Sequence, residues 1–240
     1  TYSGITTLND GVLELGDGGT SGALNPSATI VNDASLHFNR SDDVTQGIDF
    51  GTITGTGSVV QVGSGTLLLT ADNTFAGATI INSGIVDASS LGNVNTPSAI
   101  GRGSVGGSAA DLRINASTLR YAGVAMQSSD RLFTMGAGSA TLDASGGTMT
   151  LGSTGGAISF AAPHPATLSL TGSSVGVLGA ELPDSGTGTN ITSLTKSGNG
   201  KWVLSAANTF TGPVNVQGGA LYINGSNSTP EITVTTGAVL

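Results

Sequence analysis

The chain has 240 residues, of which 9% are charged and 4% aromatic, and it contains 39 glycines and no cysteine. The formal net charge is −8 and the seven basic residues are scattered, whereas nucleic-acid-binding proteins carry clustered lysine and arginine, so we expect no nucleic-acid partner. No apolar run approaches the roughly 20 residues of a membrane span, so we also expect no membrane contact by this segment itself.

The hydrophobic residues make up 38% of the chain and arrive in short runs between polar turns, which argues against disorder. The first runs, 5–8 and 12–15, flank Asp10-Gly11, a strong turn signal because glycine accepts positive φ. Two further runs, 29–31 and 36–38, flank a second polar turn. Runs of three to five residues between such turns predict β-strands, not helices.

One stretch occurs twice without gaps, at residues 61–88 and 196–223. The two copies share nine glycine, leucine, alanine, asparagine, threonine and phenylalanine positions: Gly63/Gly198, Gly65/Gly200, Leu69/Leu204, Ala71/Ala206, Asn73/Asn208, Thr74/Thr209, Phe75/Phe210, Gly77/Gly212 and Gly84/Gly219. A partial copy is cut by the start of the chain, where Thr1, Tyr2, Gly4 and Gly11 match Thr209, Phe210, Gly212 and Gly219. In chain order this is copy one, residues 61–88 are copy two and residues 196–223 are copy three. We therefore predict a repeat protein.

A second strand–turn–strand module follows each copy, at 29–38, 112–121 and 232–240. Repeat copies thus lie near 1–38, 61–121 and 196–240. Such modules bury their aliphatic residues only by stacking, so we predict an all-β fold in which parallel coils form a β-solenoid of on the order of ten coils and ~50 Å. Asn73 and Asn208 are expected at corners, where their side chains bond the backbone and Phe75 and Phe210 cover the core.

No composition break marks a domain boundary, so we expect one continuous solenoid over residues 1–240, as a fragment of a longer repeat protein. The longest insertion, Ser89 to Asp111, is expected to bulge from the coil, because solenoids place length changes in outer loops. Between 126 and 182 the pattern is looser. Strands are expected there near 132–135, 140–142, 149–151, 158–160 and 168–170.

The pattern K-x-G-x-G-x-hydrophobic-x-L-S-x-x-N-T-[FY]-x-G, followed by an apolar run and G-[GAT]-L, resembles the passenger-associated transport repeat of bacterial autotransporters. The residues that carry it are Lys196, Gly198, Gly200, Leu204, Asn208, Thr209, Phe210, Gly212, Gly219 and Leu221. The segments 36–43 and 129–135 resemble those that often precede this repeat. Copy two departs from the pattern at Gln61, where lysine is usual, and at Ile85, where leucine is usual.

The resemblance implies a right-handed parallel β-helix in the passenger of a Gram-negative, cell-surface or secreted protein. In that family the repeat is linked to secretion and to folding of the passenger outside the cell. We expect a structural or interaction segment and not an enzyme, namely a rigid stalk in an extracellular adhesin or fibre. Its partners would be neighbouring repeats of the same chain, a host or matrix surface, or a second copy bound end to end.

Candidate nucleophiles are Ser185, within Asp184-Ser185-Gly186, and Ser21, within Gly19-Thr20-Ser21. A catalytic triad needs a histidine base beside the serine, and the chain has only His37 and His164. His37 occupies a strand position equivalent to Arg120, and His164 lies between two prolines. We therefore name no catalytic residue.

The main enzymatic alternative is a glycan-processing β-helix enzyme, which needs acids gathered on one face. Asp42, Asp43 and Asp130 are its candidates, and Asp17, Asp42 and Asp43 are candidates for calcium. Calcium-loop motifs are absent, so we name no metal site and no cofactor. Trp202 aligns with Leu67 and is predicted to be a core or corner aromatic and not a sugar-stacking platform. An ice-binding surface is disfavoured because coil lengths vary.

Overall fold

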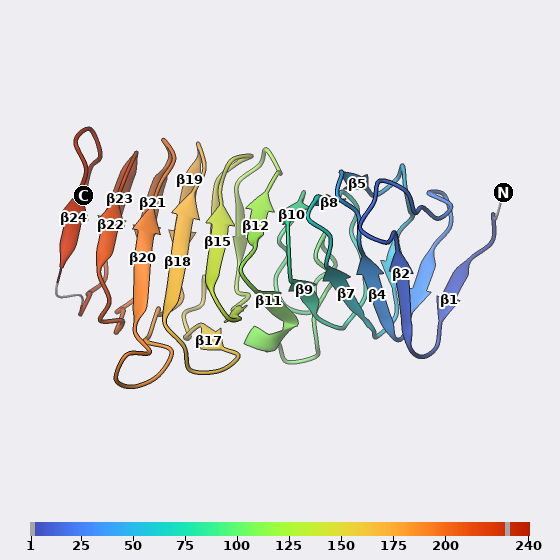
Figure 1. The fold of residues 1–240 in the computed structure, drawn as a ribbon, viewed down its shortest axis with the longest axis horizontal. Coiled ribbons are helices and arrows are strands. Elements are labelled where there is room, and N and C mark those ends of the chain that lie inside the picture. Colours follow the sequence, from blue (N-terminus) through green and yellow to red (C-terminus); the bar gives the residue numbers. More distant parts are fainter. Residues whose placement is uncertain (1–2, 229–230) are drawn as a thin grey trace.

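The chain winds into a rod of stacked coils, shown from blue to red along its length in Figure 1. The computed structural model describes residues 3–228 and 231–240, so the predicted matches at Thr1 and Tyr2 lie outside the described residues. Every named strand pairs in parallel with strands one coil away. The predicted all-β fold and parallel β-solenoid are confirmed.

The largest sheet has nine strands and runs along most of the rod. Its members are β5 (Val44–Thr45), β8 (Thr66–Leu69), β10 (Ile85–Ala88), β12 (Thr118–Tyr121), β15 (Ser139–Asp143), β18 (Ala166–Thr171), β20 (Thr192–Lys196), β22 (Val214–Val216) and β24 (Ile232–Val234). A seven-stranded sheet contains β2 (Val12–Leu15), β4 (Ser35–Phe38), β7 (Ser58–Gln61), β9 (Thr79–Ile81), β11 (Leu112–Ile114), β14 (Thr134–Met135) and β17 (Ser159–Phe160).

Two smaller sheets follow one another along a third side. The first contains β1 (Thr6–Leu8), β3 (Ile30–Asn32) and β6 (Ile53–Thr54), and the second β13 (Gln127–Ser129), β16 (Met149–Leu151), β19 (Val175–Leu178), β21 (Lys201–Leu204) and β23 (Ala220–Ile223). Loops fill this side between the two sheets. The Thr74 amide donates to the Ile53 carbonyl of β6, and the Ser129 hydroxyl of β13 donates to the Gly92 carbonyl. The described residues hold one short 3₁₀ helix, η1 (Ala109–Asp111), and no helix long and apolar enough to cross a membrane.

Alternation of side chains across each strand builds the core. Residues with period two point inward, as in β8, β12 and β21, where buried and partly exposed residues alternate. Inward residues of neighbouring coils stack in register, and one such column is Leu67, Val86, Leu119, Leu142 and Leu170. All five are fully buried, and each such side chain contributes roughly 1.5–3 kcal/mol. Stacking therefore supplies the stability that no single coil has.

Equivalent strands of copy two and copy three lie in different sheets, that is, on different sides of the rod. Copy two occupies β8, β9 and β10, in the nine-, seven- and nine-stranded sheets, whereas copy three occupies β21, β22 and β23, in the five-, nine- and five-stranded sheets. The prediction that His37 and Arg120 are equivalent is wrong in space for the same reason. His37 lies on β4 of the seven-stranded sheet, and Arg120 on β12 of the nine-stranded sheet.

The prediction that the insertion, Ser89 to Asp111, bulges from the coil holds only for its tip. Its tip is exposed, with Val105 82% accessible, but Leu91, Ala99 and Ile100 are buried in the core. The physical reason is that the insertion carries its own apolar residues, which gain more by packing against the coils than by facing water. Of the predicted strand near 132–135, only Thr134–Met135 pairs as β14. The other four strands expected between 126 and 182 are present as β15 to β18.

Candidate functional site

The polar residues of the repeat signature lie at the ends of inward columns, where the coil turns. Lys196 ends β20 and is fully buried. Its ammonium group donates to the carbonyls of Ser197 (2.6 Å), Gly198 (3.0 Å) and Gly218 (3.0 Å), and burial lowers the pKa of Lys196. This lysine therefore closes two glycine turns, one in its own coil and one in the next.

In copy two Gln61 bonds the carbonyls of the glycine turn in the same way, although the repeat pattern has lysine at this position. It is buried at the end of β7, and its amide nitrogen donates to the carbonyls of Gly63 (2.9 Å) and Gly65 (3.0 Å). Both side chains thus donate to carbonyls of the glycine turn that follows their strand. The departure at Gln61 thus changes the charge of the corner and not its hydrogen bonding to the turn.

Asn73 and Asn208 bind adjacent coils together at the predicted corners. The Asn73 Oδ1 accepts from the Ile53 amide (2.9 Å), and its Nδ2 donates to the Ala99 carbonyl (2.8 Å) and, at 3.2 Å, to a carbonyl two residues back. Asn208 accepts in the same way from the Leu182 amide (3.0 Å) and donates two residues back. Both are buried, so these bonds satisfy backbone groups that water cannot reach.

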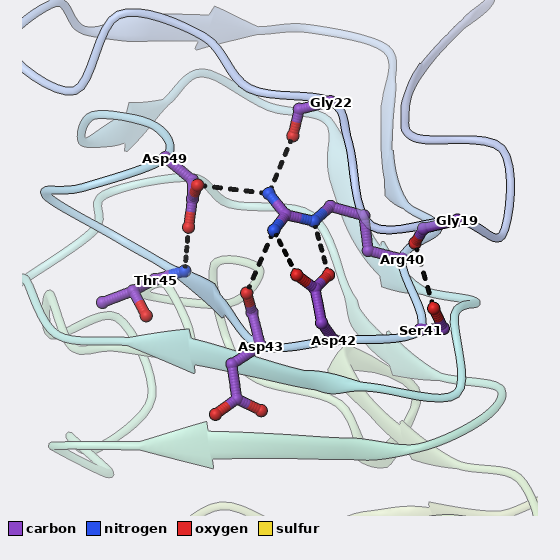
Figure 2. Close-up of polar contacts among 8 residues, drawn as sticks. All are labelled: Gly19, Gly22, Arg40, Ser41, Asp42, Asp43, Thr45 and Asp49. Atoms are coloured by element: carbon purple, nitrogen blue, oxygen red, sulfur yellow. Dashed lines mark hydrogen bonds and ion pairs between the residues drawn. The ribbon is translucent and has the colours of Figure 1, made fainter.

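Arg40 gathers the acidic candidates near the start of the rod, as Figure 2 shows. Its guanidinium binds both oxygens of Asp42 at 2.8 Å and one oxygen of Asp49 at 3.1 Å. It also donates to the Gly22 carbonyl (3.2 Å). These bonds raise the pKa of Arg40, and the arginine lowers the pKa of the Asp42 carboxyl. Asp43 contributes its carbonyl, while its carboxylate points away from the arginine.

Asp130 belongs to a different cluster, beside the insertion. Its Oδ1 accepts from the Val94 amide (2.7 Å), and the neighbouring Arg131 is buried. Arg131 donates to the carbonyls of Gly92 (2.7 Å) and Gly101 (2.8 Å), with no carboxylate of the described residues bonded to it, and desolvation lowers its pKa. Asp42 and Asp130 therefore each hold a loop in place, in separate parts of the rod. The paired acids that a glycosidase needs are not formed from them.

The serine candidate and its histidine do come together, but not as a triad. The Ser185 hydroxyl donates to the His164 carbonyl and accepts from the His164 amide (3.1 Å). The His164 Nδ1 lies 2.7 Å from the Ala162 carbonyl. Among the described residues the Ser185 hydroxyl is bonded only to backbone groups, of His164 and Asn190, so the imidazole ring is not placed to take its proton. Asp184 instead accepts from the amides of Thr192 (2.8 Å) and Thr211 (3.0 Å). All three residues hold the loop before β20.

The remaining candidates also have local partners. Asp17 accepts from the Gly19 amide (3.2 Å), and His37 lies 3.8 Å from Glu14 and 3.0 Å from the Ser35 hydroxyl. Within residues 3–228 and 231–240, no group of three or more His, Asp or Glu side chains is arranged to hold a metal ion. Trp202 is fully buried, as predicted, and its indole donates to the Thr171 carbonyl (2.8 Å).

Two surface hollows flank the insertion, and the sequence did not point to them. One, of about 380 Å³, lies between the insertion and coil residues that include Asp130 and Leu132. The other, of about 450 Å³, is bordered by Arg102, Thr56 and Thr74. Asn95 borders both, and its φ of 64° is unusual for a residue other than glycine. The signal available in the sequence was only the length of the insertion.

Comparison with known proteins agrees with this geometry. The model of the passenger-associated-transport-repeat family matches residues 1–15, 59–88 and 194–223. Over 299 aligned residues the chain is 31% identical to the Adhesin BmaC autotransporter of Brucella suis biovar 1 (strain 1330), with 97% of this chain covered. This is an autotransporter passenger segment built on transport repeats. No solved structure matches it.

The passenger segment spans 9% of the length of that relative. The resemblance stated from the sequence is confirmed, and the family matches at 59–88 and 194–223 include both buried corner residues, Gln61 and Lys196. They also include Asn73 and Asn208. Within the passenger segment, the residues that define the repeat are thus the ones that close the coil. A segment of this kind belongs to a cell-surface or secreted protein.

Proposed function

We propose that the segment is a rigid stalk within a surface adhesin of a Gram-negative bacterium, linked to its outer membrane or released from it. The observation that carries the proposal is the use of the repeat signature. Lys196, Asn73 and Asn208 are buried and bonded to backbone groups of their own or adjacent coils, so the polar residues of the signature hold stacked coils together. The name of the relative, an adhesin, supports the setting.

The same construction supports a role in secretion and folding. Each coil pairs with the coil before it, so an emerging chain folds by adding coils to an existing edge. Such growth needs no energy source besides burial of apolar surface and pairing of strands. The repeat would then contribute both to export of the passenger and to its final length.

Deletion of whole coils tests the stalk directly. Ser139 pairs with Thr167, so deletion of residues 139–166 removes one coil and lets β12 stack on β18 in register. In the parent protein displayed on cells, we expect this variant to reach the surface, resist protease and shorten the rod by about 4.8 Å. The matched control deletes residues 139–152, half a coil, which misplaces every later corner and should give a protease-sensitive product. Equal protease resistance of the two variants would contradict the proposal.

The enzymatic alternative is tested separately. The purified segment is incubated with a panel of polysaccharides, and release of reducing ends or unsaturated sugars is measured. We expect no turnover, because Asp42 is bonded to Arg40 and Asp130 to the Val94 amide, in separate parts of the rod. Turnover that is lost in Asp42→Asn or Asp130→Asn would reverse the ranking of the two functions.

A further inference from the structure

Arg102 stands apart from the other basic residues of the described chain. Arg40 and Arg120 bind carboxylates, Arg131 and Lys196 bind carbonyls, Arg113 donates to the Ala110 carbonyl, and Lys201 lies 5.4 Å from the centre of the Tyr222 ring. For the Arg102 side chain, no hydrogen bond or ion pair is found among the described residues. Its Nε is buried and lacks a partner. A buried donor without a partner is costly, and the two Nη atoms beyond it, which are open to solvent, can take an acceptor from outside.

The backbone holds Arg102 in a fixed position. Its amide donates to the Phe75 carbonyl (3.0 Å), and its carbonyl accepts from the Asn95 amide (2.7 Å). Gly101 and Gly103 on either side have φ values of 74° and 73°, a region that other residues rarely adopt. A side chain on Gly101 would also collide with the Phe75 ring, whose nearest atom would be 2.6 Å away. The arginine is thus presented by a rigid turn, which lowers the entropy cost of binding a ligand.

The hollow beside Arg102 offers further groups to a ligand. Its lining consists of Gly55, Thr56, Thr74, Asn95, Pro97 and Arg102. The Thr56 hydroxyl donates to Asp33 (3.0 Å) and so retains lone pairs for a ligand hydroxyl. The side chains of Thr74 and Asn95 have no bonded partner among the described residues and can both donate and accept. The volume of about 450 Å³ lies within the ~300–1,000 Å³ of small-molecule sites.

We propose that this hollow binds the carboxylate-bearing sugar of an acidic saccharide, with Arg102 holding the carboxylate. A guanidinium binds a carboxylate through two parallel hydrogen bonds. The hydroxyls of the same sugar match Thr56, Thr74 and Asn95, and the Pro97 ring can face its C–H groups. A compact inorganic anion would leave these groups unused.

This inference rests on the proposed adhesin function only for its biological setting, since it names a ligand class for the surface contact. The two fail separately: coil deletion and proteolysis test the stalk without ligand, and titration tests the hollow without cells. The net charge of −8 repels long polyanions, so a short saccharide is the appropriate probe.

The test is titration of the chain with trigalacturonate, followed by nuclear magnetic resonance of backbone amides. We expect shifts at Asn95, Arg102 and Thr74, and no binding of the trimethyl ester, which has the same shape without the charges. Arg102→Gln should weaken binding about tenfold or more, and Thr74→Val severalfold. Arg113→Gln is the matched control, because Arg113 is exposed and lies on the adjacent strand β11, and its effect should stay within twofold.

Thermal unfolding separates binding from folding. Because the Arg102 guanidinium bonds nothing within the described chain, Arg102→Gln should leave Tm unchanged, and a lower Tm would show a structural role and overturn the proposal. It is also overturned if trigalacturonate does not bind at millimolar concentration, or if the ester binds equally. Displacement by an equal concentration of inorganic phosphate would likewise overturn it, by showing a general anion site.

Discussion

Copy two and copy three of the repeat fill the same inward position with different volumes. In copy two, Leu67 pairs with Val44 of the preceding coil, and in copy three Trp202 pairs with Gly176. All four are buried, and a side chain added to Gly176 would come within 2.3 Å of the Trp202 ring. Two side chains of intermediate size, Val44 and Leu67, thus fill the same inward position as a glycine and a tryptophan. Packing is set between coils, so one copy cannot be understood apart from the coil beneath it.

The corners differ in the same way. Lys196 and Gln61 both bond the glycine turn, but only the lysine also reaches a carbonyl of the following coil. Asn73 bonds the coils on both sides through Ile53 and Ala99, whereas Asn208 bonds the Leu182 amide and the Asn227 side chain. The repeat therefore specifies the turn within a coil closely, and the contact between coils loosely.

The largest effect is expected from Trp202→Leu, which gives copy three the residue that copy two has at this position. The variant leaves a cavity above Gly176 and frees the Thr171 carbonyl, so we expect a loss of about 3 kcal/mol in the free energy of unfolding. Gly176→Ala alone should cost about 2 kcal/mol by overpacking.

In the double variant the alanine enters the space that the indole has left. The cost of Gly176→Ala should then fall to near zero, giving a coupling energy of about 2 kcal/mol in a double-mutant cycle by urea unfolding. Strict additivity of the two substitutions would show that packing between these coils is not what distinguishes the copies.

The next largest effects on the free energy of unfolding are expected from Asn73→Ala and Asn208→Ala. Removal of Asn73 leaves the Ile53 amide of one neighbouring coil and the Ala99 carbonyl of the other without this partner, for which we expect a loss of about 3 kcal/mol in the free energy of unfolding. Asn208 has fewer coil-to-coil bonds to backbone, so about 2 kcal/mol is expected. Urea unfolding measures both. A larger loss at Asn208 would contradict the ranking of the corners.

A smaller effect is expected from exchanging the corner residues. Lys196→Met leaves three carbonyls without the ammonium and should cost about 2 kcal/mol, whereas Lys196→Gln, the residue of copy two, should cost less than about 1 kcal/mol. Gln61→Lys is the reciprocal control, and it should fold with little change in stability. If glutamine proves as damaging as methionine at position 196, the two corners are not interchangeable.

The smallest effect is a pH dependence. Burial lowers the folded pKa of Lys196 below its usual 10.5, so the unfolded chain binds more protons between these two values. Stability contributed by this residue should therefore rise with pH through that window, and Lys196→Gln should lack the rise. The difference between the two proteins in urea unfolding, at several pH values up to 10.5, isolates it. A difference that falls with rising pH would refute the assignment.

Much of the fold could be predicted because local and global signals agree. Alternation in runs such as 66–69 and glycine turns such as Gly84, with φ of 60°, specify a strand and a corner within a few residues. The burial of Trp202 followed from its alignment with Leu67. The advance of the repeats around the rod could not be predicted. Coil length varies, from 18 positions between Val214 and Ile232 to 33 between Ile85 and Thr118, and no local pattern records the side on which a strand falls.

The contacts of the candidate site residues could not be predicted from the sequence for a related reason. Arg102 lies within the insertion and Arg131 beside it, and only tertiary contacts decide that Arg131 is bonded to carbonyls of the insertion while Arg102 borders a hollow. The acids Asp42 and Asp130 looked alike in sequence. One binds an arginine and the other a backbone amide, because different loops return to each.

The direction of the strand pairing has a consequence for a molecule under load. The hydrogen bonds between coils lie along the axis of the rod. A force on the two ends of the rod therefore breaks these bonds one coil at a time and does not shear a whole sheet at once. Each coil of about 20 residues that peels away adds roughly 65–70 Å of extended chain in place of one 4.8 Å step. A tether built this way lengthens under flow and absorbs work before it breaks.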